Sequence, residues 1–218
     1  MKYFNKNEET LTGIITSLSV FLLGYLNAFS TIFYSSVISP QTGNLVNLGV
    51  KLGQLDFTNL TQHFILIFGF AAGCIIASMI MTEIKKAVLF NWTIFLLVLG
   101  GLTVFHQALS RDIILLAFSF LAGLALTFFR AIGKLDINNG IMTGNLKNLY
   151  CRIHDLFSLK KTEHKTTIII YFFVILLFFS GAYVGGVISK FGSFPTLIIA
   201  NIICLLPYFI CFIGRKNN

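Results

Sequence analysis

The sequence carries little charge. Asp, Glu, Lys and Arg make up 11% of its 218 residues and hydrophobic residues make up 56%, whereas a soluble domain is about 25% charged. This composition excludes an ordinary soluble domain and predicts an all-α integral membrane protein. Six apolar stretches are each close to the roughly 20 residues that a helix needs to cross a bilayer. They lie at about residues 11–34, 61–82, 87–106, 112–129, 166–189 and 194–213.

Acidic residues are scarce, and none lies deep in an apolar stretch. Of the eight Asp and Glu residues, Glu83 and Asp112 come nearest, at the ends of stretches, where His63 and His106 also lie. Proton pumps and many proton-coupled carriers depend on a carboxylate or a His inside the membrane. If the protein is a transporter, the sequence therefore favours facilitated or ion-independent passage over proton coupling.

Motifs of metal sites and of enzymes are also missing. The four cysteines show no CxxC or Cys/His ligand spacing, so they predict neither a metal site nor a disulfide. The chain has no HExxH, no nucleophile–base motif and no glycine-rich phosphate loop. We therefore expect no catalytic residues, no metal and no cofactor. An enzyme acting on lipid-linked substrates is left as a weaker alternative with no residues to nominate.

The net charge of +8 is distributed unevenly. Thirteen of the 16 Lys and Arg residues lie in the N-terminus, the second and fourth connections between stretches, and the C-terminus, and only Lys51, Arg111 and Lys190 fall on the opposite side. The positive-inside rule then predicts that both termini are cytoplasmic. This explains the basic balance without a nucleic-acid partner.

One motif occurs twice. Residues 42–49 (TGNLVNLG) and 143–150 (TGNLKNLY) agree at six of eight positions with an offset of 101. Each copy predicts a helix start with Thr42 or Thr143 as the N-cap residue.

The motif divides the chain into similar halves. Each half has three predicted spans, and an odd number places the halves in opposite orientations across the membrane. The sequence thus predicts a single transmembrane domain over residues 1–218, built from two inverted three-span repeats at about 11–105 and 112–213. Each repeat carries a short Thr-Gly-Asn-capped helix after its first span.

Glycines recur at matching places in the two halves. The pairs are Gly24 with Gly123, Gly69 with Gly181, and Gly73 with Gly185. Small residues four positions apart let helix backbones approach closely in lipid, so we interpret Gly69, Gly73, Gly181 and Gly185 as packing positions. Gly24 and Gly123 belong to small, weakly polar stripes on the first and fourth spans that face the bundle interior, and the sequence leaves open whether these stripes line a path.

Candidate solute-binding residues cluster around the two motif helices. Asn and basic side chains fall on one face of each helix at spacings of three and seven residues. The free N–H groups and positive dipole end of a helix start suit a polar or anionic solute. With polar residues of the first and fourth spans, the candidates are Asn27, Thr42, Asn44, Asn47, Lys51, Thr127, Arg130, Thr143, Asn145, Asn148 and Arg152.

An alternative holds for the second motif helix. Its apolar stripe lies opposite charged residues such as Lys147 and Arg152, which is typical of a helix lying on the membrane surface against lipid phosphates. The sequence leaves open whether these helices enter the membrane.

The doubled motif also resembles a known family. Residues 24–29 (GYLNAF) and 42–45 (TGNL) are similar to the signature of the YoaK-like bacterial proteins, and residues 123–130 and 143–146 resemble its second copy. The resemblance covers about residues 13–213.

This resemblance implies a six-span, multi-pass protein of the bacterial inner (plasma) membrane with no established reaction. Two positions depart from the family pattern, which usually has Asp in place of Asn27 and Asn in place of Leu126.

We therefore expect a small-solute transporter or facilitator that binds a polar or anionic solute between inverted halves. Membrane lipid is the other expected partner, and no oligomeric state is indicated. A water-filled cavity lined by Asn27, Asn44, Thr127 and Asn145 would favour transport. A tightly packed interior with an exposed flat apolar face would favour the alternative, a non-transporting scaffold or partner-binding protein.

Overall fold

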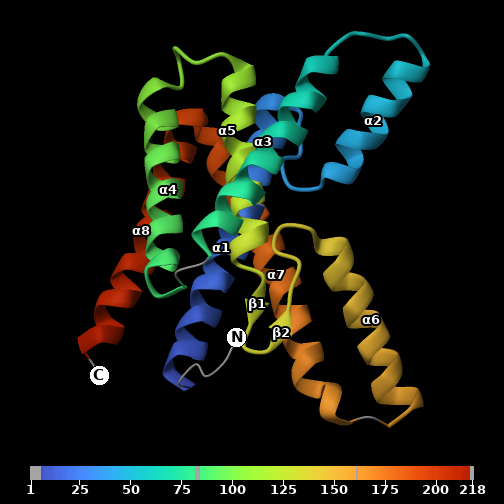
Figure 1. Cartoon of the computed structure of the whole chain (residues 1–218), viewed down its shortest axis with the longest axis vertical. Coiled ribbons are helices and arrows are strands. Elements are labelled where there is room, and N and C mark those ends of the chain that lie inside the picture. Colours follow the sequence, from blue (N-terminus) through green and yellow to red (C-terminus); the bar gives the residue numbers. More distant parts are fainter. Residues whose placement is uncertain (1–5, 82–83, 161, 217–218) are drawn as a thin grey trace.

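The computed structural model describes residues 6–81, 84–160 and 162–216 of the chain. The described chain is almost entirely helical (Figure 1). The α-helices are α1 (Lys6–Tyr34), α2 (Gln41–Gly53), α3 (Leu60–Ile80), α4 (Ile84–Phe105), α5 (Arg111–Phe128), α6 (Met142–Ser158), α7 (Lys165–Ile188) and α8 (Ser193–Lys216). A hairpin of β1 (Ala131–Ile132) and β2 (Leu135–Asp136) follows α5, and short 3-10 turns η1 (Thr162–His164) and η2 (Ser189–Phe191) flank α7.

The six predicted spans are confirmed as helices. Those long and apolar enough to cross a bilayer are α1, α3, α4, α5, α7 and α8, and their ends lie within a few residues of the predicted ones, except that α1 begins earlier. The fold is thus that of a multi-pass membrane protein. The two motif segments form α2 and α6, which are the shorter helices between spans.

The predicted caps are wrong. The helices begin at Gln41 and Met142, so Thr42 and Thr143 lie inside the first turn. The N-cap positions are Pro40 and Ile141, and neither supplies a side-chain hydrogen bond. The extended backbone before each helix is held by other side chains, described below, and this moves both helix starts ahead of the Thr residues.

Two long helix pairs form the centre of the bundle. The α1 helix packs along α7, and α3 packs along α5. A Cβ added at Gly24 would overlap the backbone oxygen of Phe178 on α7, and one at Gly181 would overlap the backbone oxygen of Phe21 on α1.

Glycines of the α3–α5 pair make the same kind of contact, and here Gly73 takes the place of Gly181, which the sequence had paired with Gly69. A Cβ added at Gly73 would overlap the backbone oxygen of Phe120, and one at Gly123 that of Phe70. The interpretation of Gly69, Gly73, Gly181 and Gly185 as packing positions is confirmed, and Gly24 and Gly123, whose role the sequence left open, pack in the same way.

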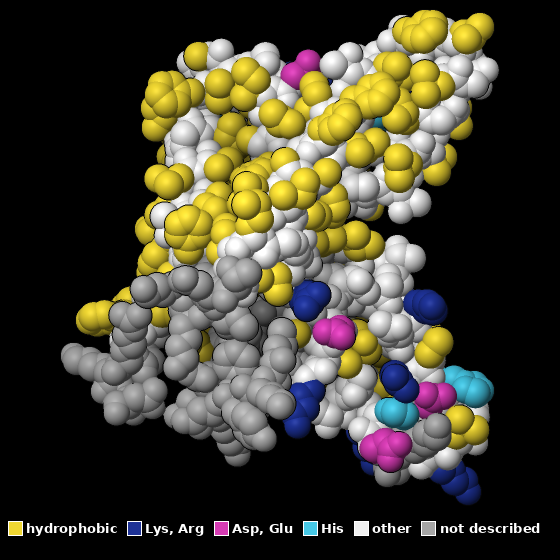
Figure 2. All heavy atoms as spheres, viewed as in Figure 1, with side chains coloured by type: hydrophobic (Ala, Val, Ile, Leu, Met, Phe, Trp, Pro, Cys, Tyr) yellow, Lys and Arg dark blue, Asp and Glu magenta, His cyan; other side chains and the backbone are white. Residues whose placement is uncertain are grey.

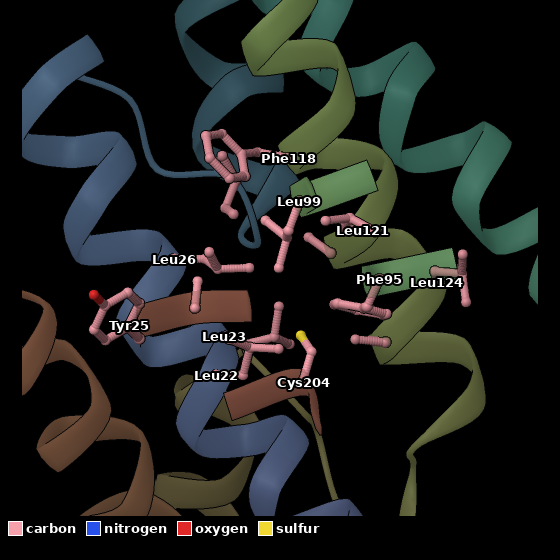
Figure 3. Close-up of a cluster of buried hydrophobic side chains, with 14 of the residues drawn as sticks. Leu22, Leu23, Tyr25, Leu26, Phe95, Leu99, Phe118, Leu121, Leu124 and Cys204 are labelled. Carbon is pink, nitrogen blue, oxygen red and sulfur yellow. The ribbon is translucent and has the colours of Figure 1, made fainter. Parts of the chain in front are cut away.

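The apolar core lies where these helices cross. Figure 3 shows side chains from α1, α4, α5 and α8 converging on one cluster. Leu22, Leu26, Phe95, Leu121 and Cys204 are among its members and are essentially inaccessible. Any polar passage must therefore run beside this cluster.

Candidate functional site

The segment between α1 and α2 turns back along α1 (Figure 1). Asn27 lies about two turns before the end of α1, and its Oδ1 accepts hydrogen bonds from the backbone N–H groups of Ile38 (3.1 Å) and Ser39 (3.3 Å). Its Nδ2 donates to Ser39 Oγ at 2.7 Å and to the carbonyl of Leu23 at 2.7 Å. Asn27 thus anchors residues 35–40 and satisfies their buried backbone groups. We call these residues the first re-entrant segment, because they turn back into the helix bundle along α1 (Figure 1).

A second re-entrant segment, residues 137–141, leads from the β1–β2 hairpin into α6. Asn145 fixes one side of it, because its side chain accepts from the backbone N–H of Asn138 and donates to the carbonyl of the same residue, both at 2.9 Å. Asn139 fixes the other side by donating from Nδ2 to Ser19 Oγ on α1 at 2.8 Å. The chain before α6 is therefore buried between its own helix and the first half.

The two re-entrant segments touch each other. A Cβ added at Gly140 would lie 3.0 Å from Ser39 Oγ and 2.8 Å from Leu23 Cδ1. Ser39 and Gly140 are both buried, and they occupy equivalent positions, since they differ by the same offset of 101 as the motif. Gly140 also has φ +77°, a conformation that side-chain-bearing residues rarely adopt.

The helices that follow diverge from this contact. In Figure 1, α2 and α6 run away from each other toward opposite ends of the molecule. Both helix starts therefore face the contact, and their partial positive charges point toward it. At the start of α2, Gln41 donates to the carbonyl of Ile38 (2.8 Å) and to Ser119 Oγ on α5 (3.4 Å).

A polar pocket of about 350 Å³ lies next to the second re-entrant segment. It is lined by Leu126, Arg130, Asp136, Ile137, Asn138 and Asn139. Its volume is at the lower end of the range of small-molecule sites.

The opposite end of the bundle is closed by paired polar groups. Arg111, at the start of α5, donates to the carbonyl of Tyr34 (2.6 Å) and to Gln62 Oε1 (2.9 Å). Gln62 Nε2 in turn donates to Ser36 Oγ in the first re-entrant segment. This network ties together the end of α1, that segment, α3 and α5.

The three predicted Asn residues nearest the helix starts are buried and already bonded. Asn27 and Asn145 hold the re-entrant segments, as described. Asn44 donates to Gln41 Oε1 at 2.9 Å, and its Oδ1 lies 3.4 Å from His63 Nδ1 on α3. These amides bond to the protein's own backbone and side chains, and none of them is among the residues that line the polar pocket.

The two predicted basic residues of the motif helices lie far from the contact between the segments. Lys51 forms an ion pair with Asp56 (2.9 Å) and donates to the carbonyl of Thr58 (2.8 Å). Hydrogen bonds from Thr58 and Lys51 hold the pKa of Asp56 well below its usual range.

Arg152 pairs with Asp155 at 3.3 Å and lies 3.4 Å from His164 Nε2. Because α2 and α6 diverge, the structure separates the two basic residues that the sequence placed in one site. A joint role of Lys51 and Arg152 in binding one solute stays a prediction.

The other predicted solute-binding residues lie in different parts of the structure. Thr42, Asn47 and Thr143 are exposed on α2 and α6, and Asn148 donates to Tyr171 Oη at 3.2 Å. The remaining two lie in or after the last turn of α5: Thr127 is half-buried, and Arg130 lines the polar pocket.

Sequence reasoning missed Ser39, Asp136, Asn139 and Gly140. The last three lie in a polar stretch that is typical of a surface loop, which hid the burial of Asn139 and Gly140 and the place of Asp136 in the pocket lining. The signal that could have found Ser39 and Gly140 is the motif offset, extended upstream of the Thr residues.

The family comparison agrees with the earlier resemblance. The family described as a protein of unknown function, DUF1275, matches residues 15–210. The YoaK-like proteins are a DUF1275 family, so the resemblance is confirmed. No curated protein and no solved structure matches the chain. The chain belongs to the DUF1275 family.

Proposed function

We propose that this DUF1275 protein is a transporter or facilitator that moves a small polar solute across the bacterial plasma membrane. The observation that carries the proposal is the buried contact between Ser39 and Gly140, where two re-entrant segments and two helix starts converge. Non-helical backbone at membrane depth is tolerated where protein or a water-filled path covers it. Broken helices that meet at the centre of a bundle are a recurring way of building solute sites in transporters.

We further propose that the halves are inverted repeats. Under the motif offset, α1 corresponds to α5, α2 to α6, α3 to α7 and α4 to α8. The packing of α1 on α7 then matches that of α5 on α3, the packing of α2 on α3 matches that of α6 on α7, and α4 packs on its counterpart α8. The directions of α1 and α5, which are opposite in Figure 1, support this relation.

The charge distribution supports cytoplasmic termini. Both termini lie at the same end of the molecule in Figure 1, and Figure 2 shows Lys and Arg gathered at that end over α6 and the hairpin. The positive-inside rule assigns this end to the cytoplasm. The polar pocket then opens on the cytoplasmic side, and the Arg111 network closes the outer side, which fits an inward-facing conformation.

The buried polar groups support passage without proton coupling. Within the described ranges, the polar residues that are buried are Ser, Thr, Asn and His63, with no Asp or Glu among them. His63 lies in the first turn of α3, against Asn44, and not deep in a span. A solute crossing here would meet neutral donors and acceptors, so a gradient of the solute itself is sufficient to drive its movement.

The test is release from proteoliposomes. Vesicles with the purified protein and protein-free vesicles are loaded with a mixture of small polar metabolites, and the retained compounds are measured by mass spectrometry. We expect at least one compound to leave faster in the presence of the protein. Gly140→Ala should slow that release, because the added methyl group enters the contact with Ser39, whereas Gly43→Ala, on the exposed side of α2, should not.

Equal retention of every compound in the two vesicle populations would contradict transport. It would favour the scaffold alternative, which has two observations behind it. Asn27, Asn44 and Asn145 are bonded within the protein, and α2 exposes Leu45, Val46 and Val50. The melting temperature of each variant is measured first, so that slow release is not attributed to unfolded protein.

A further inference from the structure

The polar pocket holds two opposite charges that are not paired. Arg130 directly precedes β1 and Asp136 ends β2, so the hairpin brings them to neighbouring positions, with the backbone N–H of Ile137 donating to the carbonyl of Arg130 at 2.8 Å. Both side chains line the pocket. In the part of the chain that the structure describes, neither forms an ion pair or a side-chain hydrogen bond, whereas Asp56 and Asp155 both pair with nearby bases.

The pocket wall also contains an unpaired buried acceptor. Asn139 is fully buried, and its Nδ2 is committed to Ser19 Oγ. Its Oδ1 has no hydrogen-bond partner among the described residues. Buried amide oxygens are normally bonded, so a donor from a ligand or from a water molecule would satisfy this atom.

We infer that this pocket binds a small zwitterion, with its acid group on Arg130 and its ammonium group on Asp136 and Asn139 Oδ1. A simple anion would meet Asp136 as well as Arg130, and a simple cation would meet Arg130 as well as Asp136. A neutral sugar would leave both charges unpaired. A zwitterion satisfies both charges, and its N–H groups supply the donor that Asn139 lacks.

The remaining lining residues restrict the size of this ligand. Leu126 and Ile137 provide an apolar wall, which fits a short aliphatic portion. The volume of about 350 Å³ admits a small α-amino acid. The same pair of charged groups is found in the headgroup of phosphatidylethanolamine, so the ligand chemistry has a free and a lipid source.

This inference rests on the proposed function, since it assigns the solute class of the inward-facing pocket. The test uses the full chain in nanodiscs of phosphatidylglycerol alone, with binding measured by thermal shift and calorimetry. The probes are glycine and serine as zwitterions, N-acetylglycine as an anion, glycine methyl ester as a cation and glycerol as a neutral solute. We expect glycine or serine alone to raise the melting temperature.

Substitutions at the two charged residues test whether the ligand binds in this pocket. Arg130→Gln and Asp136→Asn should each weaken binding at least tenfold, because each leaves one ligand charge unpaired. Lys134→Gln, in the turn of the same hairpin but outside the pocket lining, is the matched control and should bind as the parent does. Both charged positions are exposed, so these variants are expected to fold, and their melting temperatures without ligand check this.

A second set of nanodiscs contains phosphatidylethanolamine. Stabilisation by this lipid that is lost in Arg130→Gln and Asp136→Asn, without any response to free amino acids, would support the zwitterion and assign it to a headgroup. No response to either source, or unchanged binding in both variants, would overturn the inference. If another compound is still released from proteoliposomes in a Gly140-dependent manner, the proposed function stands while this assignment of the solute class fails.

Discussion

At the scale of single residues, the Asn side chains of this protein act mainly on its own backbone. Asn27 uses both its oxygen and its nitrogen to hold the first re-entrant segment, and Asn145 does the same for the second. The sequence predicted solute contacts for both, because an Asn near a helix start looks the same whether its partner is a ligand or a loop. The structure shows the loop contacts of both residues, and their contact with a solute stays a prediction.

The Asn27→Ala variant tests whether Asn27 holds the first re-entrant segment. It leaves the buried N–H groups of Ile38 and Ser39 without an acceptor, at a cost of about 1–3 kcal/mol for each group. We expect a clear loss in the free energy of unfolding, measured by denaturation in mixed micelles. Asn47→Ala removes an exposed amide of α2 and should change the free energy of unfolding little. Equal stability of the two variants would show that Asn27 does not anchor the segment.

At the scale of elements, the sequence predicts spans well and helix starts poorly. The spans follow from hydropathy and length, which depend on composition alone. The starts of α2 and α6 depend on tertiary contacts, namely those of Asn27 and Asn145, and so the local Thr rule failed. The shared face of Asn44 and Lys51 was a sound geometric inference, but the partner of Lys51 is Asp56, only five residues away.

The close contact of Gly181 with α1 leads to a prediction about helix packing. Gly181→Ala places a methyl group against the backbone of α1 and should force α1 and α7 apart. Overpacking of this kind costs about 1–3 kcal/mol. Gly186→Ala, five residues further on the same helix, meets no described atom within 4 Å and should leave the melting temperature unchanged. Similar melting temperatures for the two variants would mean that α7 can move away from α1 without a loss of stability.

At the scale of the whole molecule, the polar pocket and the Arg111 network lie at opposite ends of one bundle. The contact between Ser39 and Gly140 separates them. Little of this arrangement was predictable, because it joins residues about 100 positions apart. The doubled motif was the one part of it visible in the sequence.

Thiol labelling tests how the molecule is oriented. Cys151 on α6 is exposed, as is Gln54 at the end of α2. A membrane-impermeant reagent should label a Gln54→Cys variant in intact cells and should reach Cys151 only after the cytoplasmic side is opened. Cys204 is buried and serves as an internal unreactive thiol. Labelling of both positions from the same side would refute the inverted arrangement.

The hydrogen bond from Asn139 to Ser19 links the second re-entrant segment to the first half of the chain. A single neutral hydrogen bond contributes roughly 0.5–1.5 kcal/mol, which is only about one to three times the thermal energy. The glycine crossings on either side resist any separation of the helix backbones. Tight backbone packing at the glycines therefore stands beside a single neutral hydrogen bond between α1 and the second re-entrant segment, and breaking that bond costs less than separating either helix pair.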